Sequence, residues 1–132
     1  MIAVDTSAWA AVILGEPERA DYLAVIDANE KLLVSAATLV ELNTVVVQKL
    51  GEAAAVDVVD LMEFAGAEIA PFDSDQAGHA VSAYIRFGRG RHAANLAYGD
   101  VLAYALAKSR NVPLLFKVPG FRETDVVPAL PV

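Results

Sequence analysis

Short apolar runs alternate along this chain with longer stretches in which apolar and polar positions recur at helical spacing. The apolar runs lie within residues 2–4, 31–35, 67–72 and 114–116. Runs of this length, bounded by polar or turn-forming residues, predict buried strands. The stretches with helical spacing begin near Ser7 and Pro17 and then cover residues 38–50, 52–64, 73–87 and 99–110. The pattern therefore predicts strands that alternate with helices or with pairs of helices.

Such alternation predicts an α/β fold in three layers, in which helices cover both faces of a short, mostly parallel sheet. The length of 132 residues predicts a single domain over residues 1–132. In a parallel sheet the carboxyl ends of the strands share one edge, and ligands bind along that edge. Residues that directly follow the strands are therefore the first candidates for chemistry.

The helical stretches also predict which residues are buried and how the helices begin. The residues expected to face the core are Leu39, Leu42, Val45, Val46 and Leu50 in the stretch 38–50, and Val56, Val59 and Phe64 in the stretch 52–64. Asp73 is expected to cap the next helix, with Gln76 as its capping-box partner. We expect a loop over residues 88–97, a turn over 118–120 and a short edge strand at Val126–Val127.

Composition narrows the classes of function. The chain is 56% hydrophobic, and this surplus indicates that a partner covers some apolar surface. No apolar run approaches the ~18 residues of a membrane span, so no membrane association is expected. The first residues include no basic, signal-like segment. Cysteine is absent, which excludes disulfides and thiolate metal sites. These features favour a cytoplasmic location.

The charges are distributed unevenly. A net charge of −7 argues against a general coat for nucleic acid. Residues 76–122, however, contain seven lysines and arginines and a single acid, Asp100. This balance fits a local anion-binding face, and it fits equally well a solvated surface on which charges cluster by chance.

Three acids lie where a strand gives way to a helix. Asp5 ends the first apolar run, Glu41 follows the second, and Asp100 precedes an apolar helix pattern. Carboxylates that meet at one sheet edge repel one another and need a cation. Oxygen ligands without histidine or cysteine favour Mg²⁺ or Mn²⁺ over zinc. Such a cation can activate water beside a phosphoryl group, so the predicted reaction class is hydrolysis of a phosphodiester.

Each acid also has a purely structural interpretation. Asp5 fits the N-cap of the helix that follows it. Thr38 and Glu41 fit a capping box in which Glu41 reaches back to the Thr38 backbone. Asp100 lies in a first helical turn, where the helix dipole favours a negative charge. Taken singly, each acid fits a cap better than a metal ligand, but capping does not explain why all three fall at one edge.

Six segments in a fixed order carry a resemblance to a known family. They are Met1–Ala8, Thr38–Glu41, Gly88–His92, Tyr98–Asp100 together with Ala103–Ala107, Leu114–Lys117 and Phe121–Val126. No single segment is specific, but their order and spacing resemble PIN-domain nucleases, and among these the VapC-type toxins of bacterial toxin–antitoxin pairs. The resemblance covers essentially the whole chain.

By that resemblance, Asp5, Glu41 and Asp100 correspond to three catalytic, metal-binding acids of the family, and Thr6 or Ser7 supports the site by hydrogen bonding. The family cleaves RNA with Mg²⁺ or Mn²⁺ through metal-activated water. Its members usually dimerise, and a cognate antitoxin inserts a segment into the active-site groove. The resemblance therefore implies a ribonuclease toxin of a type II toxin–antitoxin system that acts as a homodimer.

One departure bears on activity. Between Lys117 and Phe121 the family usually has Gly followed by one or two acidic or Asn residues, whereas this chain has Val118, Pro119 and Gly120. The fourth acid is missing, so we expect a weakened or single-metal site, because three acids and waters can still hold one Mg²⁺. The alternative is a catalytically impaired PIN fold that binds RNA or antitoxin without turnover.

A basic loop and several rings complete the set of candidates. The residues expected to contact RNA phosphates or antitoxin carboxylates are Arg86, Arg89, Arg91 and His92, with a solvated loop as the alternative. The residues expected to be structural or to pack are His79, Trp9, Phe87, Tyr98 and Tyr104. The helices 38–50 and 52–64 are candidates for a dimer face or for burial beneath the antitoxin.

A third class, a phosphorylated receiver-like signalling domain, fits less well. Lys117 follows a buried strand and Asp73 follows the third strand, as a receiver requires. A receiver also needs a pair of acids after its first strand, and here that strand offers only Asp5.

Overall fold

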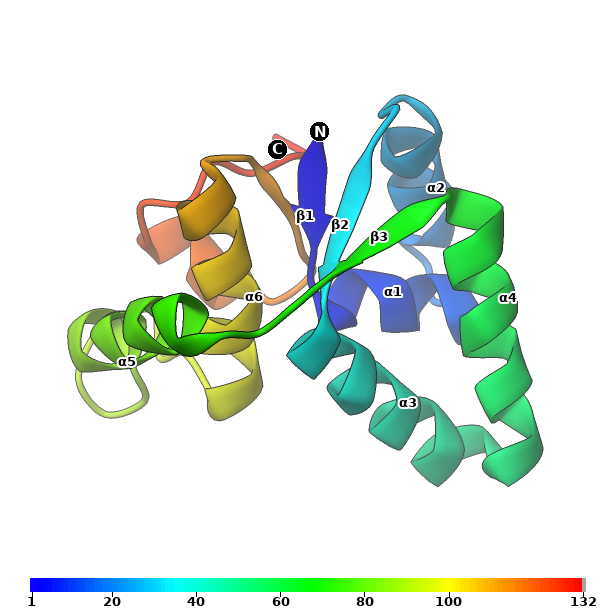
Figure 1. Cartoon of the computed structure of the whole chain (residues 1–132), viewed down its shortest axis with the longest axis horizontal. Coiled ribbons are helices and arrows are strands. Elements are labelled where there is room, and N and C mark those ends of the chain that lie inside the picture. The colour runs from blue at the N-terminus through cyan, green and yellow to red at the C-terminus, as the bar shows by residue number, and fades with distance from the viewer. Residues whose placement is uncertain (132) are drawn as a thin grey trace.

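The computed structural model describes residues 1–131 and contains a four-stranded parallel sheet with helices on both sides (Figure 1). The strands are β1 (Ile2–Val4), β2 (Leu32–Ser35), β3 (Ala67–Ala70) and β4 (Leu114–Leu115). The α-helices are α1 (Thr6–Ile13), α2 (Arg19–Asp27), α3 (Ala36–Leu50), α4 (Ala55–Ala65), α5 (Ser74–Phe87) and α6 (Tyr98–Arg110). Two 3₁₀ helices, η1 (Glu52–Ala54) and η2 (Pro119–Glu123), complete the fold.

The order of the strands is β3-β2-β1-β4, so β1 lies inside the sheet between the next strand in the chain and the last one. Ala3 is paired with Leu33 of β2 and with Leu114 of β4. The predicted three-layer α/β fold with a parallel sheet is therefore confirmed.

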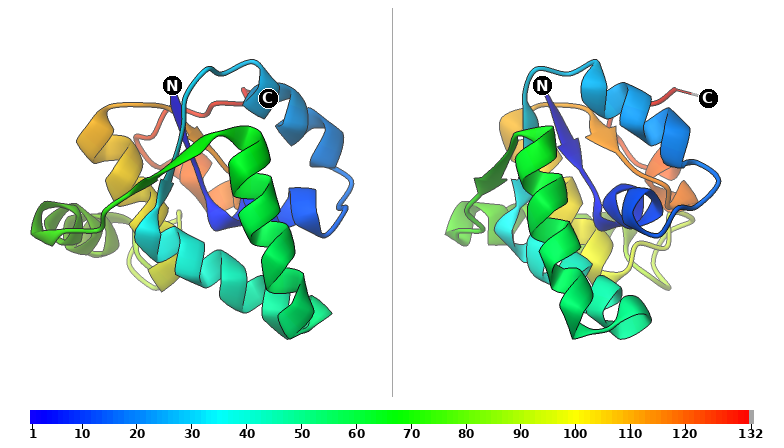
Figure 2. Two further views of the ribbon diagram at one scale, coloured as in Figure 1. Left: turned by 45° about the vertical axis from the view of Figure 1, so that its right-hand side comes forward. Right: turned by 90° about the vertical axis from the view of Figure 1, so that its right-hand side faces the viewer.

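Both faces of the sheet are buried at β1, β2 and β4, whereas Ile69 of β3 is exposed. Ile2 and Val4 point into the cluster formed with α1, α2, α3 and α4, whereas Ala3 points into the cluster formed with α5 and α6. Figures 1 and 2 show these two groups of helices on opposite sides of the strands. Because alternate side chains of a strand point to opposite faces, a strand buried on both faces needs apolar residues throughout, which explains the uninterrupted runs in the sequence.

Two helix starts differ from the predictions. Helix α2 begins at Arg19, because Pro17 lies in a turn in which the Arg19 amide donates to the Glu16 carbonyl (3.0 Å). Helix α3 begins at Ala36, because the Ser35 hydroxyl caps it by accepting from the Ala37 amide (3.2 Å). The capping box expected at residues 38–41 is therefore wrong, since those residues already lie inside the helix.

The prediction for residues 52–64 was wrong about which face is buried. The chain forms η1 and then α4, and Val58 and Met62 pack into the core. The residues expected to be buried are instead exposed, by 61% at Val56, 56% at Val59 and 76% at Phe64. Both sets have helical spacing, so periodicity alone could not choose between them. Val56, Val59 and Phe64 therefore leave an apolar strip of α4 exposed to solvent.

Near the C-terminus the structure corrects two smaller expectations. The turn over residues 118–120 extends into η2, which begins at Pro119. Val126–Val127 forms no strand, although an isolated bridge joins Leu114 to Pro128 through hydrogen bonds to the Val127 carbonyl and from the Ala129 amide (2.9 Å each). Pro128 has no amide hydrogen, which limits further pairing.

Only one of the two hydrogen bonds of the capping box predicted for helix α5 forms. Asp73 Oδ1 accepts from the Gln76 amide (3.0 Å). The Gln76 side chain does not return to Asp73, because its Nε2 donates to the Ser109 hydroxyl of α6 (2.5 Å). In residues 1–131 no helix is both long enough and apolar enough to cross a membrane.

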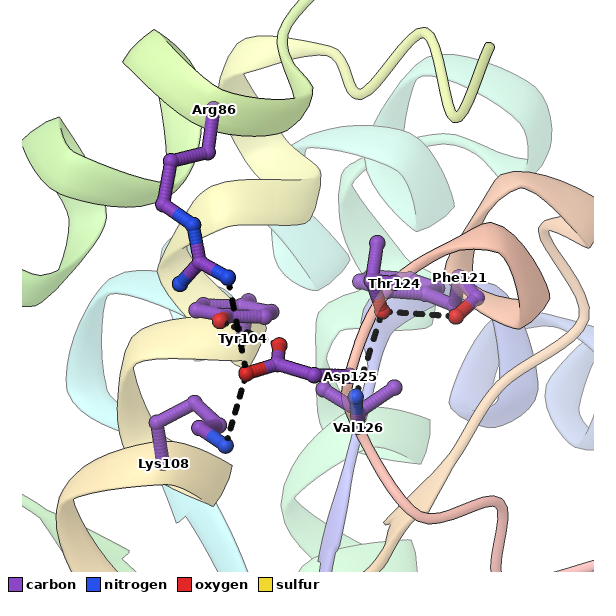
Figure 3. Close-up of polar contacts among 7 residues, drawn as sticks. All are labelled: Arg86, Tyr104, Lys108, Phe121, Thr124, Asp125 and Val126. Atoms are coloured by element: carbon purple, nitrogen blue, oxygen red, sulfur yellow. Dashed lines mark hydrogen bonds and ion pairs between the residues drawn. The ribbon is translucent and has the colours of Figure 1, made fainter. Parts of the chain in front are cut away.

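A polar cluster fixes the C-terminal segment against α5 and α6 (Figure 3). Asp125 accepts from the Tyr104 hydroxyl (2.6 Å) and pairs with Lys108 (3.1 Å) and, at longer range, Arg86 (3.8 Å). Just before it, the Thr124 hydroxyl donates to the carbonyl of buried Phe121 (2.6 Å). These contacts hold η2, and with it residues 118–120, beside the edge of the sheet.

Candidate functional site

Asp5, Glu41 and Asp100 line one pocket of about 370 Å³. Asp5 directly follows β1, Glu41 lies in the second turn of α3, and Asp100 lies in the first turn of α6. The pocket is therefore at the carboxyl end of a central strand, where ligands of parallel sheets bind. Its lining also includes Thr6, Ser7, Lys49, Lys117 and Val118.

Asp5 is almost completely buried, with 2% of its surface exposed. Its Oδ2 accepts from the Ser7 amide (3.0 Å) and from the Ser7 hydroxyl (2.6 Å), so Asp5 does cap α1. In residues 1–131 its Oδ1 is buried and has no hydrogen-bond partner. The capping interpretation is thus correct for one oxygen and leaves the other without a function in the fold.

The environment of Asp5 is unfavourable for a negative charge. Burial raises the pKa of Asp5 to about 7, and the hydrogen bonds from Ser7 oppose that rise. The charges of Asp100 and Glu41 raise the pKa further, which is the electrostatic consequence of placing three acids in one pocket.

Glu41 is held from α1. The Thr6 hydroxyl donates to Glu41 Oε1 (2.5 Å) and lies 3.5 Å from the Thr38 carbonyl. Glu41 does not reach back to the Thr38 amide, which corrects the capping-box interpretation of this residue. A buried hydroxyl therefore fixes the orientation of a half-buried carboxylate.

Asp100 is held from its own helix. Its Oδ2 accepts from the Ala97 amide (2.8 Å), an N-terminal capping contact as the structural interpretation expected. Burial raises the pKa of Asp100, while the Ala97 amide and the positive charge of Arg89 lower it. Arg89 is thus electrically coupled to this acid.

Ser7 connects the pocket to the far end of the chain. Its hydroxyl donates to Asp5 and accepts from the Lys117 amide (2.9 Å), which follows β4. The Lys117 ammonium pairs with Glu16 (2.7 Å) and Glu18 (2.9 Å) rather than with the three pocket acids. Thr6 and Ser7 therefore each support a different carboxylate.

The donor set suits a hard divalent cation. One oxygen of each pocket acid accepts hydrogen bonds, and within residues 1–131 the second oxygen of each accepts none. Histidine does not line this pocket. No three His, Asp or Glu side chains in residues 1–131 are already gathered closely enough to hold an ion. A cation held by all three acids would therefore require their side chains to move closer together.

The segment in which the resemblance leads one to expect a fourth acid reads Val118, Pro119 and Gly120. Val118 lines the pocket together with the three acids. Gly120 packs so tightly that a Cβ added there would overlap the Ala94 carbonyl oxygen. Val118 is therefore the residue of this segment from which a carboxylate could reach the pocket.

The basic loop divides into one residue beside the pocket and three that are engaged elsewhere. Arg89 lines a second pocket of about 630 Å³ that shares Asp100 and Val118 with the first. The other three residues make contacts elsewhere. Arg86 pairs with Asp125, Arg91 Nε donates to the Ile85 carbonyl (3.0 Å), and His92 Nδ1 accepts from the Ala94 amide (3.0 Å).

The aromatic residues behave as expected with one exception. Trp9, Phe87 and Tyr104 are buried, as predicted. Tyr98 was expected to pack but is 78% exposed, because it lies at the outer side of the first turn of α6. His79 remains a surface residue that faces Asp75 one helical turn earlier (3.8 Å).

Comparison with known proteins agrees with this architecture. The profile of the PIN domain family matches residues 2–126. The VapC ribonuclease Mb0640 of Mycobacterium bovis is 36% identical over 125 residues, which are 95% of each chain. The ribonuclease VapC of Mycolicibacterium smegmatis is 37% identical over 125 residues, covering 95% of this chain and 97% of the relative.

Solved structures show the same fold. VapC20 of Mycobacterium tuberculosis, described as a Sarcin-Ricin loop cleaving toxin, superposes with a TM-score of 0.81 at 19% identity over 99% of this chain and 100% of that one. A chain of VapBC2 from Rickettsia felis, bound to promoter DNA, gives a TM-score of 0.73 at 17% identity over 96% of both chains. The chain belongs to the PIN domain family and, within it, to the VapC-type toxins.

Sequence reasoning missed two residues of the site. Val118 was treated as a departure from the family, and the structure places it in the lining of the pocket with the three acids. Gly99, which directly precedes Asp100, lies against Glu41. A glycine in a helical turn beside a candidate acid is a signal that could have drawn attention to Gly99.

Replacing Asp5 with Asn should stabilise the metal-free protein at high pH. Because the pKa of Asp5 is raised to about 7, the folded protein keeps a proton that the unfolded chain has released, and stability falls as pH rises from about 4 to about 7. The substituted amide stays neutral and can still accept from Ser7. At about pH 8 the gain should be a few kcal/mol, at about 1.4 kcal/mol per pKa unit, and it should shrink toward pH 4.

Urea unfolding in EDTA, followed by the fluorescence of buried Trp9, measures this difference. Asp73→Asn is the matched control, because Asp73 also caps a helix but is exposed to water. A wild type as stable as Asp5→Asn at high pH would contradict the expected cost of the buried charge.

Proposed function

We propose that the protein is a ribonuclease toxin of a toxin–antitoxin pair that cleaves RNA phosphodiesters with Mg²⁺ or Mn²⁺ held by Asp5, Glu41 and Asp100. The observation that carries the proposal is the meeting of these three carboxylates in one pocket, each fixed through one oxygen with the other left over. Relatives named as VapC ribonucleases support the same activity. Acting on cellular RNA, the protein would work in the cytoplasm.

The residues of the pocket prepare it for a cation and a phosphate. Ser7 and Thr6 orient two of the carboxylates, and the Ala97 amide orients the third. When bound, Mg²⁺ or Mn²⁺ supplies a water of lowered pKa and neutralises charge on the phosphoryl group. The buried Asp5 carboxylate gives up its proton on binding, so metal affinity should rise with pH.

Arg89 extends the site toward the RNA backbone. Its pocket shares Asp100 and Val118 with the acid pocket, so the two pockets adjoin, and together they are the proposed RNA groove. A guanidinium there suits a phosphate next to the one that is cleaved, since arginine binds phosphate through paired N–H donors. We therefore assign RNA contact first to Arg89 and only secondarily to Arg86, Arg91 and His92.

The site is expected to be weak. Val118 places an apolar side chain beside the three acids, and the contact of Gly120 with Ala94 leaves no room for a side chain at 120. Fewer charged ligands lower the affinity for a hard cation. The alternative function, a PIN fold that engages RNA or antitoxin without turnover, rests on this same observation.

Two apolar surfaces are available for protein partners. One lies on α3, α4 and β3, where Val40, Val59, Phe64 and Ile69 are exposed beside a groove lined by Leu39 and Met62. The other lies on α5 and α6, where Val81, Tyr84, Ile85 and Tyr98 are exposed. We propose that antitoxin binding and homodimer formation cover these surfaces. Similar folds have been solved in toxin–antitoxin complexes, including one from Klebsiella pneumoniae (TM-score 0.71, 16% identity).

Asp100→Asn tests the metal site. We expect calorimetric titration to show Mn²⁺ binding to the wild type and a loss of more than about 100-fold in the variant, because even outer-shell changes cost 10- to 100-fold. RNA cleavage should fall in parallel. Asp57→Asn is the control, since Asp57 is also a first-turn acid but lies on α4, away from the pocket. Equal Mn²⁺ binding by the wild type and by Asp100→Asn would show that Asp100 is not a metal ligand.

Val118→Asp tests whether the missing acid limits turnover. The new carboxylate faces the other three, so Mn²⁺ affinity should rise by about tenfold or more. Val118→Asn controls for polarity without charge. If the wild type cleaves RNA and Val118→Asp cleaves it faster, the protein is a weakened enzyme. Cleavage that appears only in Val118→Asp supports the binding module instead.

Arg89→Ala should weaken RNA binding more than Arg91→Ala, because only Arg89 lines the groove. Fluorescence anisotropy with a labelled RNA in EDTA avoids cleavage during the measurement. We expect the slope of log affinity against log salt to fall by about one in Arg89→Ala and to stay unchanged in Arg91→Ala. Equal losses in both variants would indicate a diffuse basic surface.

A further inference from the structure

Gly99 occupies a position where the backbone does not require glycine. It is the second residue of α6 and is buried. The glycines with positive φ in this chain are Gly15, Gly51, Gly66 and Gly90, and Gly99 is not among them. In helical backbone, alanine is more favourable than glycine by about 1 kcal/mol. The absence of a side chain at 99 must therefore have another explanation.

That explanation is the carboxylate of Glu41. A Cβ added to Gly99 would overlap Glu41 Oε2 and would lie 2.5 Å from Cδ and 2.8 Å from Oε1. By contrast, a Cβ added to Gly78, an exposed glycine within α5, meets nothing within 4 Å. The overlap at Gly99 is specific to one side chain from another helix.

We propose that Gly99 is a positioning residue, whose missing side chain provides the space in which the Glu41 carboxylate sits beside Asp100. This inference rests on the proposed function in one respect, namely that Glu41 serves as a metal ligand. The hydroxyl of Thr6 holds Glu41 from α1, and the bare Cα of Gly99 bounds it on α6. Glu41 is thereby confined between two helices.

The close approach places the Glu41 carboxylate against the first turn of α6. The first turn of α6 presents backbone N–H groups and the positive end of the helix dipole, which stabilise an anion placed against them. A methyl group at 99 would separate the carboxylate from this turn. Because Glu41 is long and flexible, it would swing aside rather than disrupt the fold. The substitution should therefore damage the site far more than the structure.

A double-mutant cycle in EDTA tests the steric contact without any metal. Glu41→Ala removes the overlapping group, so Gly99→Ala should then raise the thermal midpoint by about 1–4 °C, as expected for a favourable Gly→Ala change in a helix. With Glu41 present, the rise should be smaller or absent, because Glu41 must leave the Thr6 hydroxyl to make room for the methyl group. An equal response to Gly99→Ala in the two backgrounds would overturn the proposal.

Metal affinity tests the positioning role. Gly99→Ala should weaken Mn²⁺ binding by about 10- to 100-fold, as for other residues that orient a ligand. Gly78→Ala, an equivalent change in α5, should bind Mn²⁺ like the wild type. Unchanged affinity in Gly99→Ala would overturn the role in metal binding.

The two measurements separate this inference from the proposed function. If the wild type itself binds no Mn²⁺, the proposed metal site fails. A background-dependent response in the double-mutant cycle would still support the space that Gly99 provides for Glu41. If the wild type binds Mn²⁺ but the cycle shows no dependence on Glu41, the proposed function stands and the role of Gly99 is rejected.

Discussion

The buried carboxylate of Asp5 is the group on which the rest of the site depends. It is tied to α1 through Ser7 on one oxygen, and its other oxygen is buried without a hydrogen-bond partner in residues 1–131. Burial and two neighbouring acids raise its pKa to about 7. A buried carboxylate with so high a pKa is kept in place only when the surrounding structure holds it there. Such strained or perturbed groups concentrate at functional sites.

Capping and metal binding turn out to be compatible rather than competing interpretations. A carboxylate has two oxygens, and in Asp5 and Asp100 one oxygen serves the helix while the other remains available. Glu41 follows the same rule with the Thr6 hydroxyl in place of a backbone amide. The local helix contacts therefore orient the acids, so the same hydrogen bonds that stabilise the fold also arrange the pocket.

The sheet and most helices could be predicted from the sequence, because strands buried on both faces produce unmistakable apolar runs. The buried face of α4 could not, since Val56 and Val58 belong to strips of equal periodicity and only packing against α1 and α3 selects one of them. The start of α3 was missed because Ser35 was assigned to a strand. It is both the last residue of β2 and the cap of the helix.

The candidate acids were found from their positions after strands, whereas their partners were not. Thr6 and Ser7 were grouped as interchangeable supports, and only three-dimensional contacts show that each serves a different acid. The role proposed for Gly99 depends on Glu41, a side chain 58 positions away in sequence. The four members of the basic loop look alike in sequence, and their intramolecular contacts separate Arg89 from the rest.

The pairing of β1 with β4 has a consequence for the order of folding. Ala3 and Val4 pair with Leu114 and Leu115, and Ser7 bonds to Lys117 across 110 positions. Contacts between such distant segments close late in folding. A partly folded chain in which these two segments have not yet met therefore lacks one wall of the acid pocket, so the pocket is completed only together with the sheet.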